Sequence, residues 1–300
     1  MNENRNAAPV VAGVDGSRSA LRAVRWAAAE AVRRDVPLRL VHAYVIPTRG
    51  YPERIVTVRQ VRTGLEKQSH DWLQEAATAA AAVAGVRVES RPVIGETVRA
   101  LVTESRDAAL MVVGTRGLGG FTGLLLGSNA AALARHGHCP VLVVRGETPD
   151  DEVLSTRPVL VGVDGSPASD TALGFAYREA AIRGVPLVAV HAWCDVTSDV
   201  TERVYDVPVD WEELDAELRG QLDDQLAAWE QKYPDVPLRR VPVRGRAART
   251  LLAQGRQAQL IVVGVRGAGG FAGMLLGSTS RALIYHAPCP VAVVRPVPEA

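Results

Sequence analysis

The sequence has no excess of either charge and very few cysteines. Lysine and arginine together number 34 and aspartate and glutamate 33, which leaves a net charge of +1 over 300 residues. Nucleic-acid-binding surfaces usually need a basic excess, so this balance argues against nucleic acid as a partner. The three cysteines, Cys139, Cys194 and Cys289, form no CxxC pair and have no metal-ligand spacing. We therefore expect no disulfide framework and no metal site, and the scarcity of cysteine suits a reducing cytosol.

The sequence also lacks a hydrophobic run long enough to cross a membrane. Its first ten residues, MNENRNAAPV, contain no apolar core of signal-peptide length. The most apolar stretch, AATAAAAVAGV at 76–86, is dominated by alanine and is too short to span a bilayer. We therefore expect a cytoplasmic protein that has no membrane partner.

Several catalytic and phosphate-binding motifs are missing as well. No GxxxxGK[ST] sequence occurs, and the glycines from residue 117 onward do not complete GxGxxG. Thr122 stands where the third glycine is required, and Ala272 stands there in a second copy. GxSxG and HExxH are absent, and no arrangement of Ser, His and Asp indicates a triad. We expect neither a P-loop NTPase nor an ordinary dinucleotide site, and we predict no catalytic residue.

What the sequence does contain is a repeat of about half its own length. Four segments recur in the same order at an offset of 149 or 150 residues. They are VVAGVDGS (10–17) with VLVGVDGS (159–166), VPLRLVHAY (36–44) with VPLVAVHAW (185–193), LMVVGTRG (110–117) with LIVVGVRG (260–267), and HCPVLVVR (138–145) with PCPVAVVR (288–295). We infer a gene duplication that gives domains at 1–147 and 157–300, joined by an acidic linker at 148–156.

Within each half, short Val-rich runs bounded by Gly, Pro or Asp alternate with alanine-rich helical patterns. The apolar runs predict buried parallel strands at 10–14, 38–43, 86–93, 109–113 and 141–144, and at 159–163, 187–192, 238–243, 259–263 and 291–294. Helical patterns occupy 18–34, 62–84, 96–106 and 128–136 of the first half. This alternation predicts an α/β protein with two tandem doubly wound five-stranded parallel-sheet domains and right-handed crossovers.

Two glycine-rich stretches, GTRGLGGFTGLLLGS (114–128) and GVRGAGGFAGMLLGS (264–278), each follow the fourth predicted strand of a half. Strand-to-helix connections usually have about 2–6 residues, and each stretch is more than twice that length. Open α/β sheets bind ligands beyond the carboxyl ends of their strands, where glycine lets backbone N–H groups approach an anion and the next helix adds its positive dipole end. We interpret Ser128 and Ser278 as N-caps whose hydroxyls cap the helix or bind a phosphate oxygen. The alternative is an irregular surface loop with Ser128 as a plain cap.

An aspartate follows the first predicted strand of each half, in the sequence GVDGS. Asp15 and Asp164 stand beside the expected ligand crevice, where a carboxylate accepts hydrogen bonds from a ribose hydroxyl or an adenine amine. The alternative is that each aspartate caps the helix that follows. Both halves keep Asp where Ser or Asn would cap equally well, which favours a functional role.

The histidines and the cysteines before proline have simpler interpretations. His42 and His191 end an apolar strand, which favours hydrogen-bonded core histidines over catalytic ones. Cys139 and Cys289 precede Pro at the start of a strand and are expected to be small buried apolar residues.

Taken together, these residues resemble the universal stress protein family, specifically its ATP-binding branch. That branch carries G-x2-G-x9-G-[ST] after its fourth strand, and both glycine-rich stretches fit it without a gap. The aspartate after the first strand and an HxxCPVxVV-like sequence at the last strand are also similar to this family. The second feature reads His136-Gly137-His138-Cys139-Pro140 in the first half and His286-Ala287-Pro288-Cys289-Pro290 in the second. The resemblance covers 8–146 and 157–296, and the tandem arrangement resembles the two-domain stress proteins of actinobacteria.

The resemblance implies a Rossmann-like, adenine nucleotide alpha hydrolase-like fold and one ATP site in each half, with Mg2+ as a companion of the triphosphate. The aspartates would contact the nucleoside, two alanine backbones the adenine, two arginines the phosphate charge, and the glycines with the helix start the phosphates. The implied site residues are Gly13, Asp15, Ala43, Gly114, Arg116, Gly117, Gly127, Ser128 and Asn129, and in the second half Gly162, Asp164, Ala192, Gly264, Arg266, Gly267, Gly277, Ser278 and Thr279.

The resemblance also implies partners and a role. In this family the last strand mediates dimer contacts, which implies a pseudo-dimer of the two halves and a homodimer of chains. An ATP-binding regulator of growth or stress response, acting on a protein partner that the sequence does not identify, is the function we expect. A slow ATPase and a non-enzymatic chaperone-like stress protein are the alternatives. The halves differ at Glu96 and Arg246, and the more basic second site is expected to bind phosphate more tightly.

Overall fold

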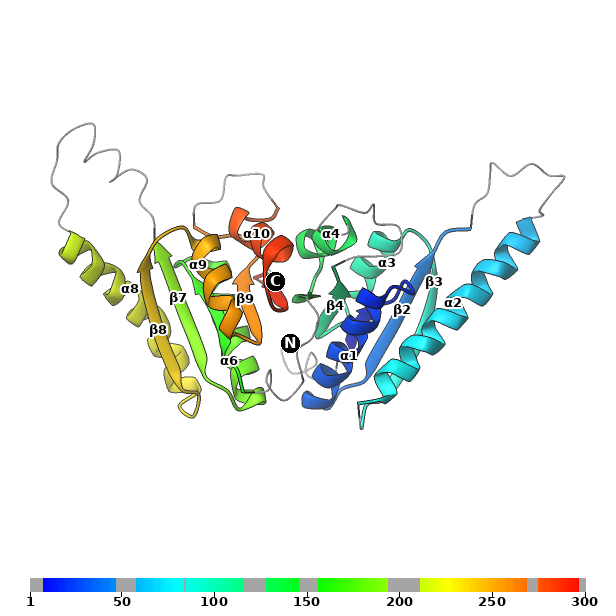
Figure 1. Cartoon of the computed structure of the whole chain (residues 1–300), viewed down its shortest axis with the longest axis horizontal. Helices are drawn as coiled ribbons and strands as arrows, with labels where there is room; N and C mark the ends of the chain where they lie inside the picture. Colours follow the sequence, from blue (N-terminus) through cyan, green and yellow to red (C-terminus); the bar gives the residue numbers. More distant parts are fainter. Residues whose placement is uncertain are drawn as a thin grey trace, which may run out of the picture. The chain divides into compact units, whose positions relative to one another are not determined.

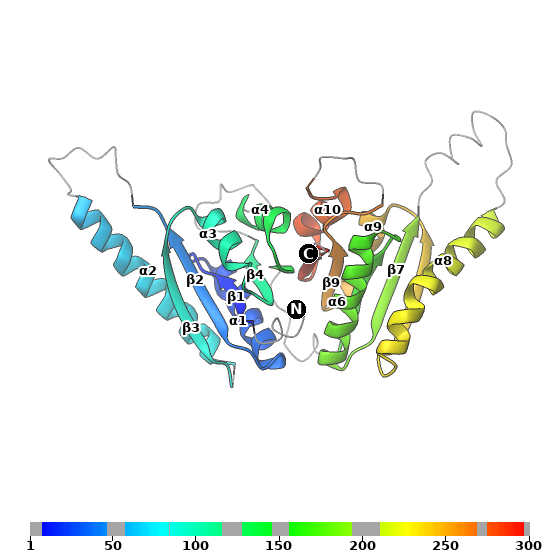
Figure 2. The same cartoon turned by 180° about the vertical axis from the view of Figure 1, so that it is seen from behind.

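The computed structural model describes residues 8–46, 58–83, 85–115, 128–145, 156–193, 211–268 and 275–296. The chain divides into two compact units, Met1–Thr148 and Pro149–Ala300. Each unit is an α/β sandwich with a parallel sheet between helices (Figures 1 and 2).

The first unit has a five-stranded parallel sheet in the order β3-β2-β1-β4-β5. Its strands are β1 (Val10–Gly13), β2 (Leu38–Tyr44), β3 (Val88–Ile94), β4 (Leu110–Gly114) and β5 (Val141–Val144). Its helices are α1 (Arg18–Arg33), α2 (Val58–Ala81), α3 (Thr97–Glu104) and α4 (Ser128–His136).

The second unit repeats this topology, with the parallel strand order β8-β7-β6-β9-β10. Its strands are β6 (Val159–Val163), β7 (Leu187–Trp193), β8 (Leu238–Arg244), β9 (Leu260–Gly264) and β10 (Val291–Val294). Its helices are α6 (Pro167–Arg183), α8 (Trp211–Lys232), α9 (Ala247–Gln254) with the short 3-10 turn η2 (Gly255–Gln257), and α10 (Ser278–His286). The predicted doubly wound α/β fold is confirmed in both units.

The helices cover both faces of each sheet. In the first unit α1 and α2 contact each other and the strands on one face, and α3 and α4 contact each other on the other face (Figures 1 and 2). In the second unit, α6 and α8 pair in the same way, as do α9 and α10. Because both faces are covered, the central strands β1, β4, β6 and β9 are almost wholly buried, which explains their continuous Val-rich sequences.

Local sequence explains where α1 begins. The hydroxyl of Ser17 accepts a hydrogen bond from the N–H of Ala20 at 3.1 Å, which caps the helix. Alanines at spacings of three and four, such as Ala20, Ala23 and Ala27, then form the buried face. Gly16 precedes the cap with a φ of 76°, and a Cβ there would overlap the ring of Trp72. Glycine is therefore required at this turn on two counts.

The prediction of buried strands is wrong for the two runs at 86–93 and 238–243. They form β3 and β8, which pair only with β2 and β7 in the part of the chain that the structure describes, and lie at an edge of their sheets. Residues such as Arg91 and Arg240 are exposed there. A central proline in each strand suits an edge, because proline has no N–H to donate to a further strand.

Candidate functional site

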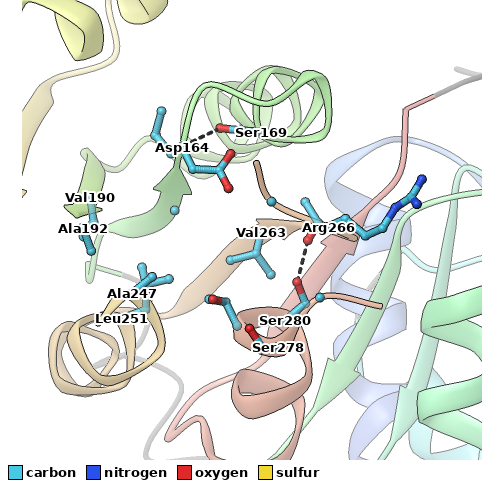
Figure 3. A pocket seen from close by; sticks show the side chains of 16 residues that line it. Asp164, Ser169, Val190, Ala192, Ala247, Leu251, Val263, Arg266, Ser278 and Ser280 are labelled. Carbon is cyan, nitrogen blue, oxygen red and sulfur yellow. Dashed lines mark hydrogen bonds between the residues drawn. The ribbon is translucent and has the colours of Figure 1, made fainter. Parts of the chain in front are cut away.

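A cavity opens in each unit where the carboxyl ends of the first and fourth strands diverge. In the order 3-2-1-4-5 the connections from these two strands leave toward opposite edges of the sheet, which creates a crevice. In the second unit the cavity has a volume of about 340 Å³ (Figure 3).

All nine residues implied for the second site line this one cavity. They come from β6, β7, β9, the residues that follow those strands, and the start of α10. The nine are Gly162, Asp164, Ala192, Gly264, Arg266, Gly267, Gly277, Ser278 and Thr279. Segments up to 117 residues apart in the sequence therefore meet, and their role in ligand binding stays a prediction.

The cavity has an apolar side and a polar side. Val190, Ala192, Ala247 and Leu251 group together on one side in Figure 3. Asp164 and the beginning of α10 lie away from this group, and the guanidinium of Arg266 extends away from the apolar wall (Figure 3). A ligand with a flat apolar part and an anionic part matches this division.

Asp164 holds the site together through three hydrogen bonds to its carboxylate. Its Oδ1 accepts from the N–H and the hydroxyl of Ser166, at 3.1 and 2.7 Å. Its Oδ2 accepts from the N–H of Ala268, at 3.1 Å, in the glycine-rich stretch. The carboxylate thus joins the end of β6 to the segment that follows β9.

The alternative that the aspartates cap the following helices is wrong. The side chain that caps α6 is Ser166, whose hydroxyl accepts from the N–H of Ser169 at 3.1 Å. Ser17 caps α1 in the first unit in the same way. Asp15 accepts only from the N–H of Ser17, at 3.0 Å, among the hydrogen bonds of the described residues. Each aspartate therefore orients the capping serine and keeps oxygen atoms at the cavity.

The prediction that Ser278 is an N-cap is also wrong. The N-cap of α10 is Gly277, which has no side chain to cap the helix, and Ser278 is the first helical residue. In the first unit α4 likewise begins at Ser128 itself. The backbone N–H groups of the first turn of α10 therefore lie at the cavity without a capping side chain, and they carry the positive end of the helix dipole. Such a helix start is a ready site for an anion.

Close packing requires glycine at several of the repeated glycine positions. A Cβ on Gly264 would lie 2.8 Å from the backbone C and O of Ala168 in α6, and one on Gly114 would lie 2.5 Å from Ser19 Oγ. A Cβ on Gly267 would collide with Asp164 Oδ2. A helix packs against Gly114 and Gly264, which also line the two cavities, so a close approach to phosphate stays a prediction for both.

Two serines that sequence reasoning missed fix the backbone of the site. Ser280 donates its hydroxyl hydrogen to the carbonyl oxygen of Gly264 at 2.7 Å, which ties α10 to the end of β9 (Figure 3). The hydroxyl of Ser169 accepts from the N–H of Asp164 at 3.1 Å. Neither serine stands in a recognisable motif, so only the three-dimensional contact reveals its role.

A histidine near the end of β2 and one near the end of β7 form hydrogen bonds to the backbone just before the site aspartates. His42 is buried, and its Nδ1 donates to the carbonyl oxygen of Val14 at 2.7 Å. In the second unit, Nδ1 of His191 donates to the carbonyl oxygen of Val163 at 3.0 Å. Since a carbonyl oxygen only accepts, Nδ1 carries the proton in both rings. The expectation of hydrogen-bonded core histidines is confirmed, and each ring fixes the residue before the site aspartate.

In the first unit the structure describes part of the corresponding cavity. Gly13, Asp15, Ala43, Gly114 and Asn129 line it together. Arg116, Gly117 and Gly127 lie outside the described residues, and only the backbone of Ser128 is described. The volume of about 60 Å³ therefore covers fewer residues than the volume of the second cavity and is not comparable with it.

Sequence reasoning also missed the helix that forms the apolar wall. Thr97 and Leu101 of α3 line the first cavity, and their counterparts Ala247 and Leu251 of α9 line the second. Residues four apart share a face in any helix, so this spacing alone does not mark a cavity wall. The hydroxyl of Thr97 makes the first cavity more polar at this position than the second.

Other chemistry is limited in the described part of the chain. No group of three or more His, Cys, Asp or Glu residues there is placed to hold a metal ion. Burial raises the pKa of Cys289 to about 12, so its thiol stays protonated, as expected for a small buried apolar residue. None of the described helices combines the length and apolar character needed to cross a membrane.

The fold and the cavity together define a class of protein: two α/β units, each with a crevice at the strand-order switch point that suits a small organic anion. Comparison with known proteins agrees and is more specific. The model of the universal stress protein family matches residues 7–145 and 155–295. A universal stress protein of Mycobacterium tuberculosis is 40% identical over 98% of this chain and 99% of its own length. The chain belongs to the universal stress protein family, in its tandem form, as its motifs predicted.

Two solved structures extend the comparison. A universal stress protein of Archaeoglobus fulgidus matches over 96% of both chains with a TM-score of 0.69 and 21% identity, which supports the fold alone. A universal stress protein solved in complex with cAMP is 34% identical over 47% of this chain and 99% of its own, with a TM-score of 0.37.

Proposed function

We propose that each unit binds one molecule of ATP in the cavity at its switch point. The observation that carries this proposal is the start of α10, whose N–H groups have no capping side chain and open on a cavity with an apolar far side. Triphosphate oxygens would satisfy these N–H groups, and the adenine ring would fill the apolar side. Membership of the family and the twice-repeated G-x2-G-x9-G-[ST] spacing support the same ligand.

The aspartate and the arginine have separate roles in this proposal. Asp164 accepts hydrogen bonds from the ribose hydroxyls while it holds the N–H of Ala268. Arg266 neutralises phosphate charge by turning toward the cavity when the nucleotide binds. The corresponding residues of the first unit, Asp15 and Arg116, act in the same way.

Mg2+ accompanies ATP, with phosphate oxygens and water molecules as its ligands. Within the described residues, Asp164 is the one carboxylate that lines the second cavity, and both its oxygen atoms accept hydrogen bonds from the protein. Mg2+ usually keeps several waters and takes one or two carboxylates together with phosphate oxygens, so a site with few carboxylates suits it.

We assign the nucleotide a regulatory role rather than a catalytic one. A phosphoryl transfer site needs a residue that orients or deprotonates the nucleophile. Among the described residues that line the second cavity, no histidine is present and the single carboxylate is already committed to hydrogen bonds. Nucleotide occupancy would thus change the surface that a protein partner contacts.

The test is to purify the full chain under native conditions, release its small molecules and identify them by mass spectrometry. Intact ATP in the protein, retained over hours, supports the proposal. Steady release of ADP from added ATP indicates the slow ATPase. A protein that is empty and that ignores added ATP overturns nucleotide binding and favours the chaperone-like role.

We also propose that the chain forms a homodimer and that its two domains, 1–147 and 157–300, pair as a pseudo-dimer. Within its own unit β5 pairs with β4, and β10 pairs with β9, so each of these apolar strands ends its five-stranded sheet. An apolar edge strand tends to find a partner. Sedimentation velocity that finds only monomers at micromolar concentration would contradict the homodimer, and limited proteolysis at 148–156 would test the boundary.

A further inference from the structure

A second cavity of the second unit lies at the opposite end of its sheet, and its volume is about 290 Å³. Pro158 and Pro186 immediately precede β6 and β7, and Arg239 is the second residue of β8. The cavity therefore lies at the amino ends of these strands, whereas the proposed nucleotide cavity lies at their carboxyl ends. Helix α9 borders both, because its last residue, Gln254, lines this second cavity.

The lining of this cavity combines five apolar residues with three polar side chains, none of which carries a negative charge. Pro158, Leu160, Pro186, Val188 and Ala258 supply the apolar part. The polar lining comes from a guanidinium and two carboxamides, those of Arg239, Gln254 and Gln257. None of these three side chains forms a hydrogen bond or an ion pair with another described residue.

The duplicated first unit has charged residues at the corresponding positions. Arg39 occupies the position of Val188, and Glu104 occupies that of Gln254. Arg39 Nη1 lies 3.5 Å from Glu104 Oε2, and Arg91 Nη1 lies 3.2 Å from Glu104 Oε1. Glu104 is buried by these contacts. Ion pairs therefore link the corresponding residues of the first unit.

The residues at the corresponding positions of the two units also differ in net charge, which is negative in the first unit and positive in the second. In the first unit Arg39 pairs across the strands with Glu89, at 3.3 Å, and Asp107 stands at the position of Gln257. In the second unit the same strand register places Val188 beside Arg239. Counting Arg91, whose counterpart is Val241, three carboxylates and two guanidiniums of the first unit have become one guanidinium and no carboxylate.

We propose that this second cavity binds a small organic acid, with a carboxylate head on a compact apolar body. A guanidinium binds a carboxylate in a bidentate, charge-assisted pair, and the carboxamides of Gln254 and Gln257 add neutral donors. The apolar body of the acid would contact Leu160 and Val188. It would lie where the first unit has the Arg39–Glu104 ion pair. A single guanidinium balances a monocarboxylate, whereas a phosphate dianion would stay half neutralised. This site is independent of the proposed nucleotide function.

The test is a titration of the full chain, with 13C-labelled Leu and Val methyl groups, by hexanoate and by the neutral hexan-1-ol. We expect hexanoate to shift the methyl signals of Leu160 and Val188 in a saturable way, with a dissociation constant of about 1 mM or below. Val11, the counterpart of Leu160 in the first unit, is the internal control and should not shift. Hexan-1-ol should bind at least about tenfold more weakly, because it lacks the carboxylate.

Variants separate the acid site from a general apolar effect. Arg239→Glu and Arg239→Gln should each weaken hexanoate binding about tenfold or more, whereas Arg249→Glu, an exposed arginine outside the cavity, should not. Val188→Arg combined with Gln254→Glu copies the first unit and should abolish binding. Equal binding of hexan-1-ol, equal shifts at Val11, no shift at Leu160 and Val188, or unchanged affinity in Arg239→Gln would each overturn the proposal. Thermal denaturation of each variant confirms that it folds.

Discussion

At single positions, both halves of the duplication repeat the same steric constraint. Gly114 and Gly264 end β4 and β9 where a helix backbone packs directly against the strand. Neither the glycine spacing nor the loop composition reveals this constraint, because both features also fit a phosphate-binding loop. The sequence shows that a glycine is present but does not show which structural constraint requires it.

We expect Gly264→Ala to lower the free energy of unfolding by about 1–3 kcal/mol, because its Cβ would force α6 away from the sheet. Gly220→Ala is the matched control. Gly220 lies in α8 with nothing within 4 Å of an added Cβ, so this change should stabilise the helix by about 0.5–1 kcal/mol. Chemical denaturation measures both. Equal changes in the free energy of unfolding for the two substitutions would show that the close approach of α6 to Gly264 does not affect stability.

The buried thiol of Cys289 gives a prediction about pH. Burial raises the pKa of the Cys289 thiol to about 12, whereas a cysteine thiol in the unfolded chain has a pKa of about 8.5. The raised native pKa makes its contribution to stability complete below about 8.5, and that contribution declines as the pH rises toward 12. At pH 8 iodoacetamide should leave Cys289 unmodified in the native protein and label it in denaturant, as peptide mass spectrometry would show. Labelling of the native protein at the denatured rate would contradict this burial.

At the scale of helices and strands, most of the fold could be predicted because hydrophobic pattern and capping residues determine it locally. The pattern at 18–34 corresponds to α1 at Arg18–Arg33, and the run at 141–144 is β5 without change. Exposure was harder to predict. The sequence of β3 reads as a buried strand, and only the strand order shows that it forms an edge.

The candidate site could be predicted in part for the same reason. Motif residues such as Asp164 and Gly277 stand in recognisable sequences, and the structure brings them to one cavity. The wall formed by Ala247 and Leu251 was missed because alanine and leucine are ordinary residues in any helix. The N-cap of α10 was misplaced by one residue, since Ser is the usual cap and the glycine before it has no side chain.

Helix α10 gives a prediction that separates folding from binding. A negative charge in the first turn of a helix stabilises it, by about 0.3–1 kcal/mol, but repels a phosphate. We therefore expect Ser278→Asp to preserve or raise the stability of the second unit and to weaken its nucleotide binding about tenfold or more. Ser278→Asn, which has nearly the same shape without the charge, is the control. Denaturation and titration with ATP measure the two effects, and unchanged affinity in Ser278→Asp would argue against phosphates at this helix start.

At the scale of the whole molecule, duplication has kept the cavity at the switch point in both units and changed its surroundings. Glu96 and Arg246 precede α3 and α9, beside the apolar wall of each cavity. The second site therefore has the more basic surroundings and is expected to bind ATP more tightly. Competitive titration of Asp15→Ala and Asp164→Ala variants would compare the remaining site in each. Equal affinities would contradict this difference.

The most direct test of two nucleotide sites is the stoichiometry of ATP binding to the full chain by isothermal titration calorimetry. Two molecules of ATP per chain are predicted for the unaltered protein. Asp15→Ala should weaken one binding event and leave the other intact, and Asp164→Ala should do the converse. A stoichiometry of zero or one for the unaltered chain, or a variant that alters both events or neither, would contradict the central claim that each duplicated unit holds its own nucleotide.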